Sequence, residues 1–261
     1  MSKSNLGKVT FALAAVALLF AGCSRDADKP LRMITEATFP PYEYVRGHEV
    51  VGVDVEICRA VAKKMGRPFA CETIDFDSVI PAVVGGRADF AASGLTITEA
   101  RKKEVDFSIP YMKTGIVVVF KKAKPYAKAE DLKGRKVGVQ SGSTSEAYVL
   151  KHVGHAPQVY SSSREAVAAV AAGRADFAVA DLEPTLHDLK KMPALAHSGL
   201  IASEEYGVMI KKGGSSKLLD AINEVIAEAK ADGRLAKWIE HYTADAIRNS
   251  ELLSEFATQA N

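Results

Sequence analysis

The sequence predicts an α/β protein of two similar lobes, each a mostly parallel sheet with helices on both faces, joined by two crossing strands. The first observation is a repeat, because the hexapeptide Gly-Arg-Ala-Asp-Phe-Ala occurs at 86–91 and again at 173–178. Each copy follows an apolar helical run, so its glycine is placed to end a helix and Ala-Asp-Phe-Ala to begin the next strand. On the repeat alone, a helix–glycine–strand joint without functional meaning explains the pattern equally well.

The second observation is the order of strand and helix patterns in the first half of the chain. Apolar runs of strand length alternate there with helical patterns, and a β-α-β-α-β order is typical of a mostly parallel sheet. The expected elements are strands at 31–35, 69–74 and 88–92, helices at 54–65 and 77–84, and a short helix at 98–103.

The third observation is a pair of strand-like segments, 115–121 and 205–210, that are placed to cross between the lobes. Two crossings make a hinge, and lobes that move about a hinge can close on a ligand. The elements expected between them are a helical turn at 131–134, strands at 136–140 and 175–180, and helices at 144–152, 163–172 and 183–191. Helices are expected in the tail at 215–230, 233–242 and 244–257.

These patterns divide the 261 residues into five parts. The length suits two lobes of ordinary domain size, and 48% apolar with 25% charged residues is typical of a globular protein. The expected parts are a signal peptide at 1–22, a tether at 23–30, the first part of lobe 1 at 31–118, lobe 2 at 119–210, and a return to lobe 1 with C-terminal helices at 211–261.

The N-terminal segment is expected to be a lipoprotein-type signal peptide. Two lysines precede an apolar run at 9–20 that is too short for a stable membrane span. The run ends in Leu19-Phe20-Ala21-Gly22-Cys23, which resembles a bacterial lipobox with Cys23 as the lipidated first residue of the mature protein. Phe20 stands where that pattern usually has an aliphatic residue, so a conventional signal cut near Ala21 is the alternative.

The charge of the mature chain argues against nucleic-acid binding. The formal net charge of +2 comes from 34 basic and 32 acidic residues. Lys3 and Lys8 leave with the signal peptide, whereas the first acidic residue is Asp26, so the mature chain is close to neutral. A neutral chain without basic clusters gives no electrostatic basis for a nucleic-acid partner.

Two cysteines, Cys58 and Cys71, remain in an exported chain, where disulfides persist. Cys58 lies in the helix expected at 54–65 and Cys71 in the strand that returns beside it. Helical and strand rise put the two residues at about the same height. A disulfide is therefore expected, with two separate buried thiols as the alternative, and the spacing does not suit a metal site.

The segment from Ser93 to Arg101 is the strongest candidate for an anion site. It begins where a strand ends and passes into a helix capped by Thr98. Free backbone N–H groups at that junction, the hydroxyls of Ser93 and Thr96, and the Arg101 guanidinium suit a carboxylate, because the planar fork of arginine donates two parallel hydrogen bonds. An exposed arginine on a charged helix is the alternative.

A second strand end that enters a helix lies at 140–146. Ser143 and Glu146 have capping-box spacing, and a helix N-terminus there favours a bound anion. A well-capped helix without a ligand explains the spacing too. Asp181, after the second repeat, either supplies a negative charge for an ammonium group or only caps the next helix.

Aromatic and acidic residues complete the candidate site. Phe39 follows the first strand and Phe76 the second, and aromatic residues in loops at a cleft bury the apolar body of a ligand. Each alone is more often part of a core. Glu36, the first residue after the first strand, either reaches a polar ligand side chain or stays solvated. The six histidines show no metal-ligand spacing, and neither a metal nor a cofactor is expected.

Several ordered motifs carry a resemblance to a known family. From Leu31 to about Tyr242 the chain resembles the periplasmic solute-binding proteins of polar amino-acid ABC transporters, the bacterial extracellular solute-binding proteins of family 3. The matching stretches are Thr35–Glu43, Val51–Ile57, Asp75–Ala82, Ser93–Arg101, Val105–Tyr111, Val137–Thr144 and Ala231–Gly233. The cysteine pair and a C-terminal extension after Tyr242 depart from the family pattern.

The resemblance implies a two-lobed periplasmic-binding-protein fold of type II that closes on an L-amino acid. Arg101, with the backbone amides of Thr96 and Thr144, would hold the α-carboxylate. Asp181, with the Thr96 hydroxyl and the Gly94 carbonyl, would hold the α-ammonium group.

The resemblance also implies where the ligand's side chain lies. Phe39 and Phe76 would flank it, and Ser93, Ser143 and Glu36 would line its pocket. An acid and several hydroxyls suit a cationic or amide side chain, such as that of arginine, lysine, histidine or glutamine, although an acid at this position discriminates poorly.

The function implied by the resemblance is capture of an L-amino acid in the cleft and its delivery to an ABC permease in the inner membrane. Such a protein is expected to be a monomer in the periplasm or at the cell surface, held to a membrane by lipid on Cys23. The alternative is a periplasmic enzyme of the same fold, such as a cyclohexadienyl or arogenate dehydratase. The sequence shows no Ser-His-Asp order or metal cluster to support that alternative.

Overall fold

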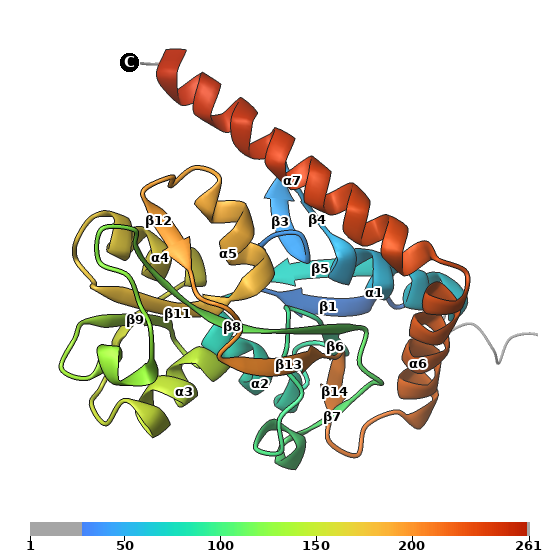
Figure 1. The fold of residues 1–261 in the computed structure, drawn as a ribbon. Helices are drawn as coiled ribbons and strands as arrows, with labels where there is room; N and C mark the ends of the chain where they lie inside the picture. The colour runs from blue at the N-terminus through green and yellow to red at the C-terminus, as the bar shows by residue number, and fades with distance from the viewer. Residues whose placement is uncertain (1–27, 260–261) are drawn as a thin grey trace, which may run out of the picture.

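Two sheets, one in each lobe, organise residues 28–259, the part of the chain that this computed structural model describes (Figure 1). The expected signal peptide and Cys23 lie outside the described residues. Between residues 28 and 259, no helix combines the length and the apolar character needed to span a bilayer.

The sheet of lobe 1 has five strands in the order β5-β1-β6-β14-β7. Strand β1 runs parallel to both of its neighbours, β5 and β6, whereas β14 runs antiparallel to both of its neighbours, β6 and β7. The strands are β1 Leu31–Thr35, β5 Phe69–Thr73, β6 Phe90–Ala91, β7 Val105–Phe107 and β14 Met209–Lys211.

Helices cover both faces of this sheet, as the sequence predicts. Neighbouring residues of a strand point to opposite faces, so Met33 packs in the cluster formed with α1, α6 and α7, whereas Ile34 packs in the cluster formed with α2. The helices are α1 Val53–Lys64, α2 Phe76–Val84, α6 Ser216–Ala231 and α7 Arg234–Gln259.

The sheet of lobe 2 follows the order β10-β9-β11-β8-β12, with β13 also paired to β8. Val118 faces the cluster that includes α3, and Val117 faces the cluster that includes α4 and α5. The elements are β8 Met112–Lys121, β9 Val137–Gln140, α3 Thr144–His152, β10 Gln158–Tyr160, α4 Ser163–Ala171, β11 Phe177–Asp181, α5 Leu182–Leu189, β12 Leu195–His197 and β13 Ala202–Tyr206.

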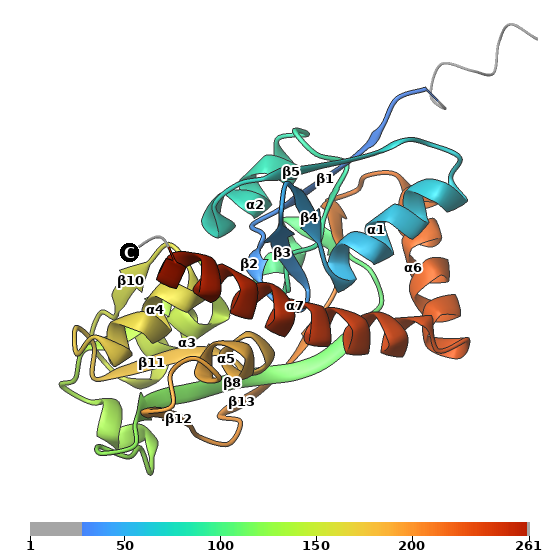
Figure 2. The ribbon, with the colours of Figure 1, turned by 90° about the horizontal axis from the view of Figure 1, so that it is seen from above.

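The lobes are joined where β8 leaves lobe 1 and β13 returns to it. The two strands pair antiparallel from Met112↔Tyr206 to Ile116↔Ala202 and run side by side between the lobes (Figure 2). The chain then enters β14 of lobe 1. The fold class predicted from the sequence is therefore confirmed. The boundary expected between residues 118 and 119 falls inside β8.

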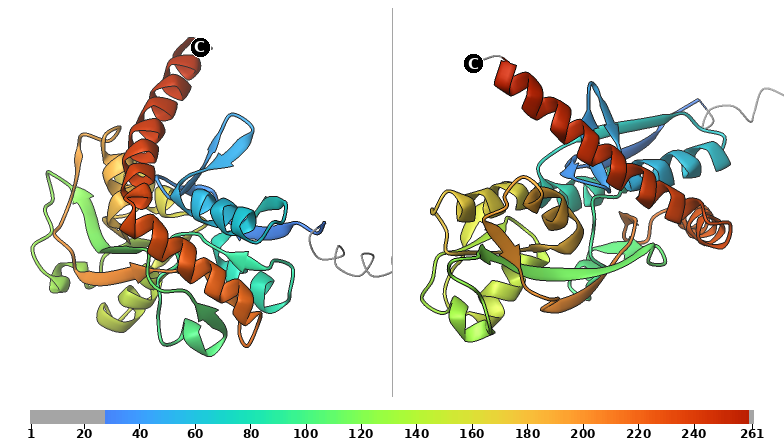
Figure 3. Two further views of the ribbon diagram at one scale, coloured as in Figure 1. Left: turned by 90° about the vertical axis from the view of Figure 1, so that its right-hand side faces the viewer. Right: turned by 45° about the horizontal axis from the view of Figure 1, so that its top comes forward.

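The sequence does not predict a small three-stranded sheet that follows β1. It consists of β2 Thr38–Phe39, β3 Glu43–Arg46 and β4 Glu49–Val51. The single helix α7, which replaces the two helices expected at 233–242 and 244–257, runs past this sheet (Figure 3). The Tyr44 hydroxyl donates to Asp245 of α7 at 2.6 Å and so ties the two together. Two short 3-10 helices, η1 Arg101–Lys103 and η2 Ala129–Leu132, complete the elements.

The expected disulfide is not formed. Cys58 and Cys71 are free thiols, of which Cys58 is buried in the lobe 1 core and Cys71 packs against the same cluster. Burial raises the pKa of both thiols, that of Cys71 to about 11, so both stay protonated. Equal height on a helix and a strand does not bring two Cβ atoms into the narrow geometry that a disulfide needs. The alternative of two separate thiols holds.

Candidate functional site

The candidate residues lie at the carboxyl ends of four strands. Glu36 follows β1 and Ser93 follows β6 in lobe 1, whereas Gln140 ends β9 and Asp181 ends β11 in lobe 2. In each lobe the two strands are part of one parallel arrangement, so their ends lie at the same edge of the sheet. Ligands of open α/β sheets bind at this edge.

Arg101 is the buried cation of this region. It lies in η1 and is only 8% exposed. Its Nη1 donates to the Thr96 carbonyl at 2.9 Å, and its Nη2 donates to the Gly142 carbonyl of lobe 2 at 3.2 Å. The guanidinium also lies 5.6 Å from the centre of the Phe76 ring. The residue is therefore anchored, while other N–H groups of its planar fork stay available for an anion.

Asp181 is a buried acid of lobe 2, only 7% exposed. The Tyr206 hydroxyl donates to its Oδ1 at 2.7 Å. Burial, followed by repulsion from Glu204, raises the pKa of Asp181 to about 7, although the Tyr206 hydrogen bond acts in the opposite direction. A cation that arrives beside Asp181 would favour its ionised form.

Gly94 is required where β6 ends. Its φ is +53°, and an added Cβ would lie 2.4 Å from the Phe39 ring, so no side chain fits. Its N–H donates to Asp54 at 2.9 Å. Thr96, two residues on, forms an isolated bridge with Tyr206, and its hydroxyl donates to Glu204 at 2.8 Å.

Ser143 caps α3, as its spacing from Glu146 predicts. Its Oγ accepts the Glu146 N–H at 3.1 Å, while the Glu146 carboxylate accepts the Gly142 N–H at 2.8 Å. Thr144 is the first residue of α3, where backbone amides have no partner within the helix. These amides are the ones that the resemblance assigns to an anion.

Two buried acids lie beneath the Ser93–Gly94 turn. Glu43 and Asp54 are 0% exposed, and burial raises the pKa of both. The Ser93 hydroxyl donates to Glu43 at 2.9 Å, as the Gly94 N–H does to Asp54. Ser93 thus has its only hydroxyl hydrogen directed away from a ligand, and its place in a ligand pocket stays a prediction.

Glu36 lies at an acidic cavity of about 560 Å³ that opens between the lobes. Its carboxylate accepts hydrogen bonds from Thr38 and from Gln140 of lobe 2, both at 2.8 Å. Burial raises the pKa of Glu36. The acids lining the cavity are Glu36, Asp75 and Glu165, and its hydroxyls are those of Thr38, Thr73, Ser78, Ser161 and Ser162.

The lobes contact each other at residues 140–142. Besides the bonds from Gln140 to Glu36 and from Arg101 to Gly142, the Ser141 hydroxyl donates to Asp77 of α2 at 2.9 Å. Candidate site residues of both lobes are therefore held in one arrangement.

Sequence reasoning missed several residues of the region. Tyr206 has its ring centre 5.2 Å from that of Tyr42 and 6.2 Å from that of Phe39, and it holds Asp181. Glu204 holds Thr96, and Glu43 and Asp54 support the Ser93–Gly94 turn. Glu43 and Asp54 lie in stretches that carry the resemblance, and Glu204 directly precedes the crossing strand predicted at 205–210, but only the folded structure shows what these acids contact. Among residues 28–259, no three or more His, Cys, Asp or Glu side chains gather in a way that could hold a metal ion.

Comparisons with known proteins identify the family of the chain. The model of the bacterial extracellular solute-binding proteins, family 3, matches residues 31–245. The arginine-binding extracellular protein ArtP of Bacillus subtilis (strain 168) is 33% identical over 236 residues, which cover 88% of this chain and 91% of ArtP.

Solved structures show the same fold. An ancestral arginine-binding protein bound to arginine is 41% identical, with a TM-score of 0.76, over 82% of this chain and 97% of that one. The same ancestral protein bound to glutamine gives a TM-score of 0.75 at the same identity and coverage.

Proposed function

Because the chain belongs to the bacterial extracellular solute-binding proteins of family 3, we propose that its cleft binds a cationic L-amino acid, with L-arginine as the expected ligand. The protein captures an amino acid outside the cytoplasm and delivers it to the permease of an ABC transporter. Like its relatives, it is a binding protein and not an enzyme.

The α-carboxylate and α-ammonium groups of the ligand are assigned to two buried side chains, Arg101 and Asp181. Arg101 and the amides of Thr96 and Thr144 bind the α-carboxylate, and Asp181 with the Thr96 hydroxyl and the Gly94 carbonyl binds the α-ammonium group. Burial of both Arg101 and Asp181 supports this assignment, because a ligand that carries both charges satisfies both groups at once.

The side-chain end carries the choice of a cationic ligand, and one observation supports it. Three carboxylates, from Glu36, Asp75 and Glu165, line the cavity of about 560 Å³. Arg87, which also lines this cavity, forms an ion pair with Glu72. A guanidinium group suits such a cavity because it donates several hydrogen bonds in fixed directions to carboxylates. Phe39 and Phe76 flank the aliphatic part, and Ser93 and Ser143 lie near it.

Glutamine is the second candidate. Gln140 and Glu36 offer one amide and one carboxylate at the same place, 2.8 Å apart, and a ligand amide needs one donor and one acceptor. The ancestral relative bound to glutamine supports this candidate.

Binding requires that the ligand prefers the closed arrangement of the lobes. Only a difference in affinity between open and closed states shifts that equilibrium. The assigned groups supply such a difference, since Arg101 is in lobe 1 and Asp181 in lobe 2, and one ligand contacts both only when the lobes are closed.

The test is a screen of the mature protein, residues 24–261, against the twenty L-amino acids after unfolding and refolding to remove bound ligand. A ligand of the native state raises the melting temperature by mass action. We expect the largest rise with arginine, a smaller one with lysine or histidine, and calorimetric binding to match. A largest rise with glutamine would favour the second candidate, and no rise with any amino acid would contradict the proposal.

We also propose that the mature protein is a monomer held to a membrane by lipid on Cys23, on the strength of the lipobox-like sequence. A Cys23→Ser variant should move from the membrane fraction to the soluble extracytoplasmic fraction. Equal fractionation of the two proteins would contradict lipid anchoring. Light scattering of the mature protein should give the mass of one chain.

A further inference from the structure

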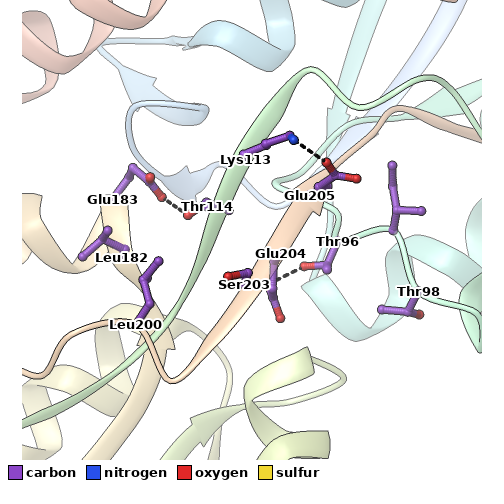
Figure 4. A pocket seen from close by; sticks show the side chains of 11 residues that line it. Thr96, Thr98, Lys113, Thr114, Leu182, Glu183, Leu200, Ser203, Glu204 and Glu205 are labelled. Carbon is purple, nitrogen blue, oxygen red and sulfur yellow. Dashed lines mark hydrogen bonds and ion pairs between the residues drawn. The ribbon is translucent and has the colours of Figure 1, made fainter.

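A cavity of about 830 Å³ on the hinge side of the cleft contains a carboxylate that has no place in the assignments above (Figure 4). We infer that Glu204 is a positioning residue of the ligand site, which fixes the Thr96 hydroxyl as an acceptor for the ligand's ammonium group and adds a second negative charge beside Asp181. This inference rests on the proposed function and deepens it.

The geometry of β13 separates Glu204 from its neighbour. Residues two apart on a strand share a face, so Glu204 lies on the face of Tyr206, which reaches Asp181. Glu205 lies on the opposite face, where it approaches Lys113 at 3.6 Å. Figure 4 shows Glu204 directed to Thr96, and Glu205 directed to Lys113.

The hydrogen bond between Thr96 and Glu204 determines what Thr96 can offer a ligand. A hydroxyl has one hydrogen to donate and two lone pairs to accept with. The Thr96 hydrogen points to a Glu204 oxygen 2.8 Å away, so toward any further group the hydroxyl acts as an acceptor. An ammonium group donates, whereas a carboxylate only accepts. The contact therefore fixes which end of an amino acid lies next to Thr96.

The charges around Asp181 support the same role. Glu204 and Glu183 face Asp181 and disfavour its ionised form, while Arg101 and the Tyr206 hydroxyl favour it. Glu204 is also the neighbour whose charge most favours the charged form of Arg101. Two carboxyls, those of Glu204 and Asp181, thus lie near one guanidinium, with Glu183 also near Asp181, and a ligand ammonium group relieves the excess negative charge.

This arrangement makes a distinct prediction for pH dependence. Burial, followed by Glu204, raises the pKa of Asp181 to about 7. Above that pH Asp181 is ionised in both proteins, so the loss of the Glu204 charge weakens binding in full. Below it, Glu204→Gln lowers the pKa of Asp181, and the larger ionised fraction of Asp181 offsets part of the lost charge. The variant and the wild type should therefore differ most at high pH.

The experiment is calorimetry of the mature protein with L-arginine between about pH 5.5 and about pH 8.5. We expect Glu204→Gln to weaken binding about tenfold at the high end and less than about twofold at the low end. Glu204→Ala, which also removes the acceptor of the Thr96 hydroxyl, should weaken binding at every pH. Glu205→Gln is the matched control and should follow the wild type.

Two outcomes would overturn the inference. A Glu204→Gln curve parallel to that of the wild type, with or without a uniform loss, would show that the charge of Glu204 does not act on the ammonium site. If Glu204→Ala binds with unchanged affinity, the Thr96 hydroxyl does not depend on Glu204 for its orientation toward the ligand. Circular dichroism and the melting temperature of the unliganded variants establish that they fold. If the wild type binds no amino acid, the proposed function fails first, and the inference with it.

Discussion

The two ends of the proposed ligand site differ in burial and in charge. At the end assigned to the α-carboxylate and α-ammonium groups, Arg101 and Asp181 are groups of opposite charge type that are 8% and 7% exposed. At the end assigned to the ligand's side chain, Glu36 is half-buried and Asp75 and Glu165 are exposed, and all three are acids. Under this proposal the first end supplies partners for both charges of any amino acid, whereas the second supplies acceptors for one class of side chain.

This contrast predicts how affinity and selectivity are divided between the two ends. Removing one partner of a buried charge pair leaves the other without compensation, which is expensive. An exposed charge is screened by water and contributes less. Changes at the amino-acid end should therefore abolish binding of every ligand, and changes at the side-chain end should alter which ligand is preferred.

The largest expected effect is that of Arg101→Ala. Loss of the buried guanidinium should weaken binding of arginine and glutamine alike, by about 3 kcal/mol or more than about 100-fold. Calorimetry of the refolded variant measures both ligands. Lys102→Ala removes the neighbouring exposed cation, which pairs with Glu99, and should bind as the wild type does. Unchanged affinity of Arg101→Ala would mean that the carboxylate lies elsewhere.

Asp181→Asn should weaken binding of every amino acid and, at the same time, stabilise the unliganded protein at high pH. The folded-state pKa of Asp181 is raised to about 7 from its ordinary value of 3.8. The stability contribution of such a group is fully present below about pH 4 and is lost as the pH rises through about 7.

Asparagine does not titrate, so the variant avoids this loss. Urea unfolding of the unliganded proteins should show the variant more stable than the wild type by about 1 kcal/mol or more at about pH 8, with a smaller difference at about pH 5. Asp220→Asn, an exposed site on α6, should show no pH-dependent difference. A constant difference at both pH values would show that Asp181 does not titrate between them.

Glu36→Gln should change selectivity and not the capacity to bind. Loss of one carboxylate from the acidic end should weaken arginine binding about tenfold. Glutamine binding should change less than about twofold, since a neutral amide gains little from the charge. Calorimetry with both ligands gives the ratio. Glu49→Gln, at an exposed residue of β4, serves as the control. An equal loss of affinity for both ligands would contradict the proposal that Glu36 contributes to selectivity.

The smallest expected effect is that of replacing a helix-capping serine beside the cleft, compared with replacing one outside the cleft. Ser143 caps α3 and Ser215 caps α6, each by accepting the N–H of the third residue onward. Replacing either serine by alanine should cost about 1 kcal/mol of stability in urea unfolding. Only Ser143→Ala should also weaken ligand binding, because only α3 begins beside the cleft. Equal affinities of the two variants would remove Ser143 from the site.

Local patterns made much of the fold predictable from the sequence. The start of α3 at Thr144 follows from the Ser143 cap, and the two Gly-Arg-Ala-Asp-Phe-Ala joints lead into β6 and β11 as expected. Such signals depend on a few neighbouring residues, and the sequence carries them directly.

Contacts between distant residues were not predictable in this way. Tyr206 and Asp181, and Thr96 and Glu204, come together only through the pairing of β13 with β8 and its bridge to lobe 1. Glu43 and Asp54 are acids, which are almost always exposed, so their complete burial gives no signal in the sequence. The same limit explains the wrong disulfide, since element height does not fix side-chain direction.

A crystal structure of the refolded protein with L-arginine tests the central claim most directly. We expect the α-carboxylate to lie on Arg101, the α-ammonium group between Asp181 and the Thr96 hydroxyl, and the guanidinium group among Glu36, Asp75 and Glu165. Arginine bound in the reverse direction, or bound outside the cleft, would contradict it.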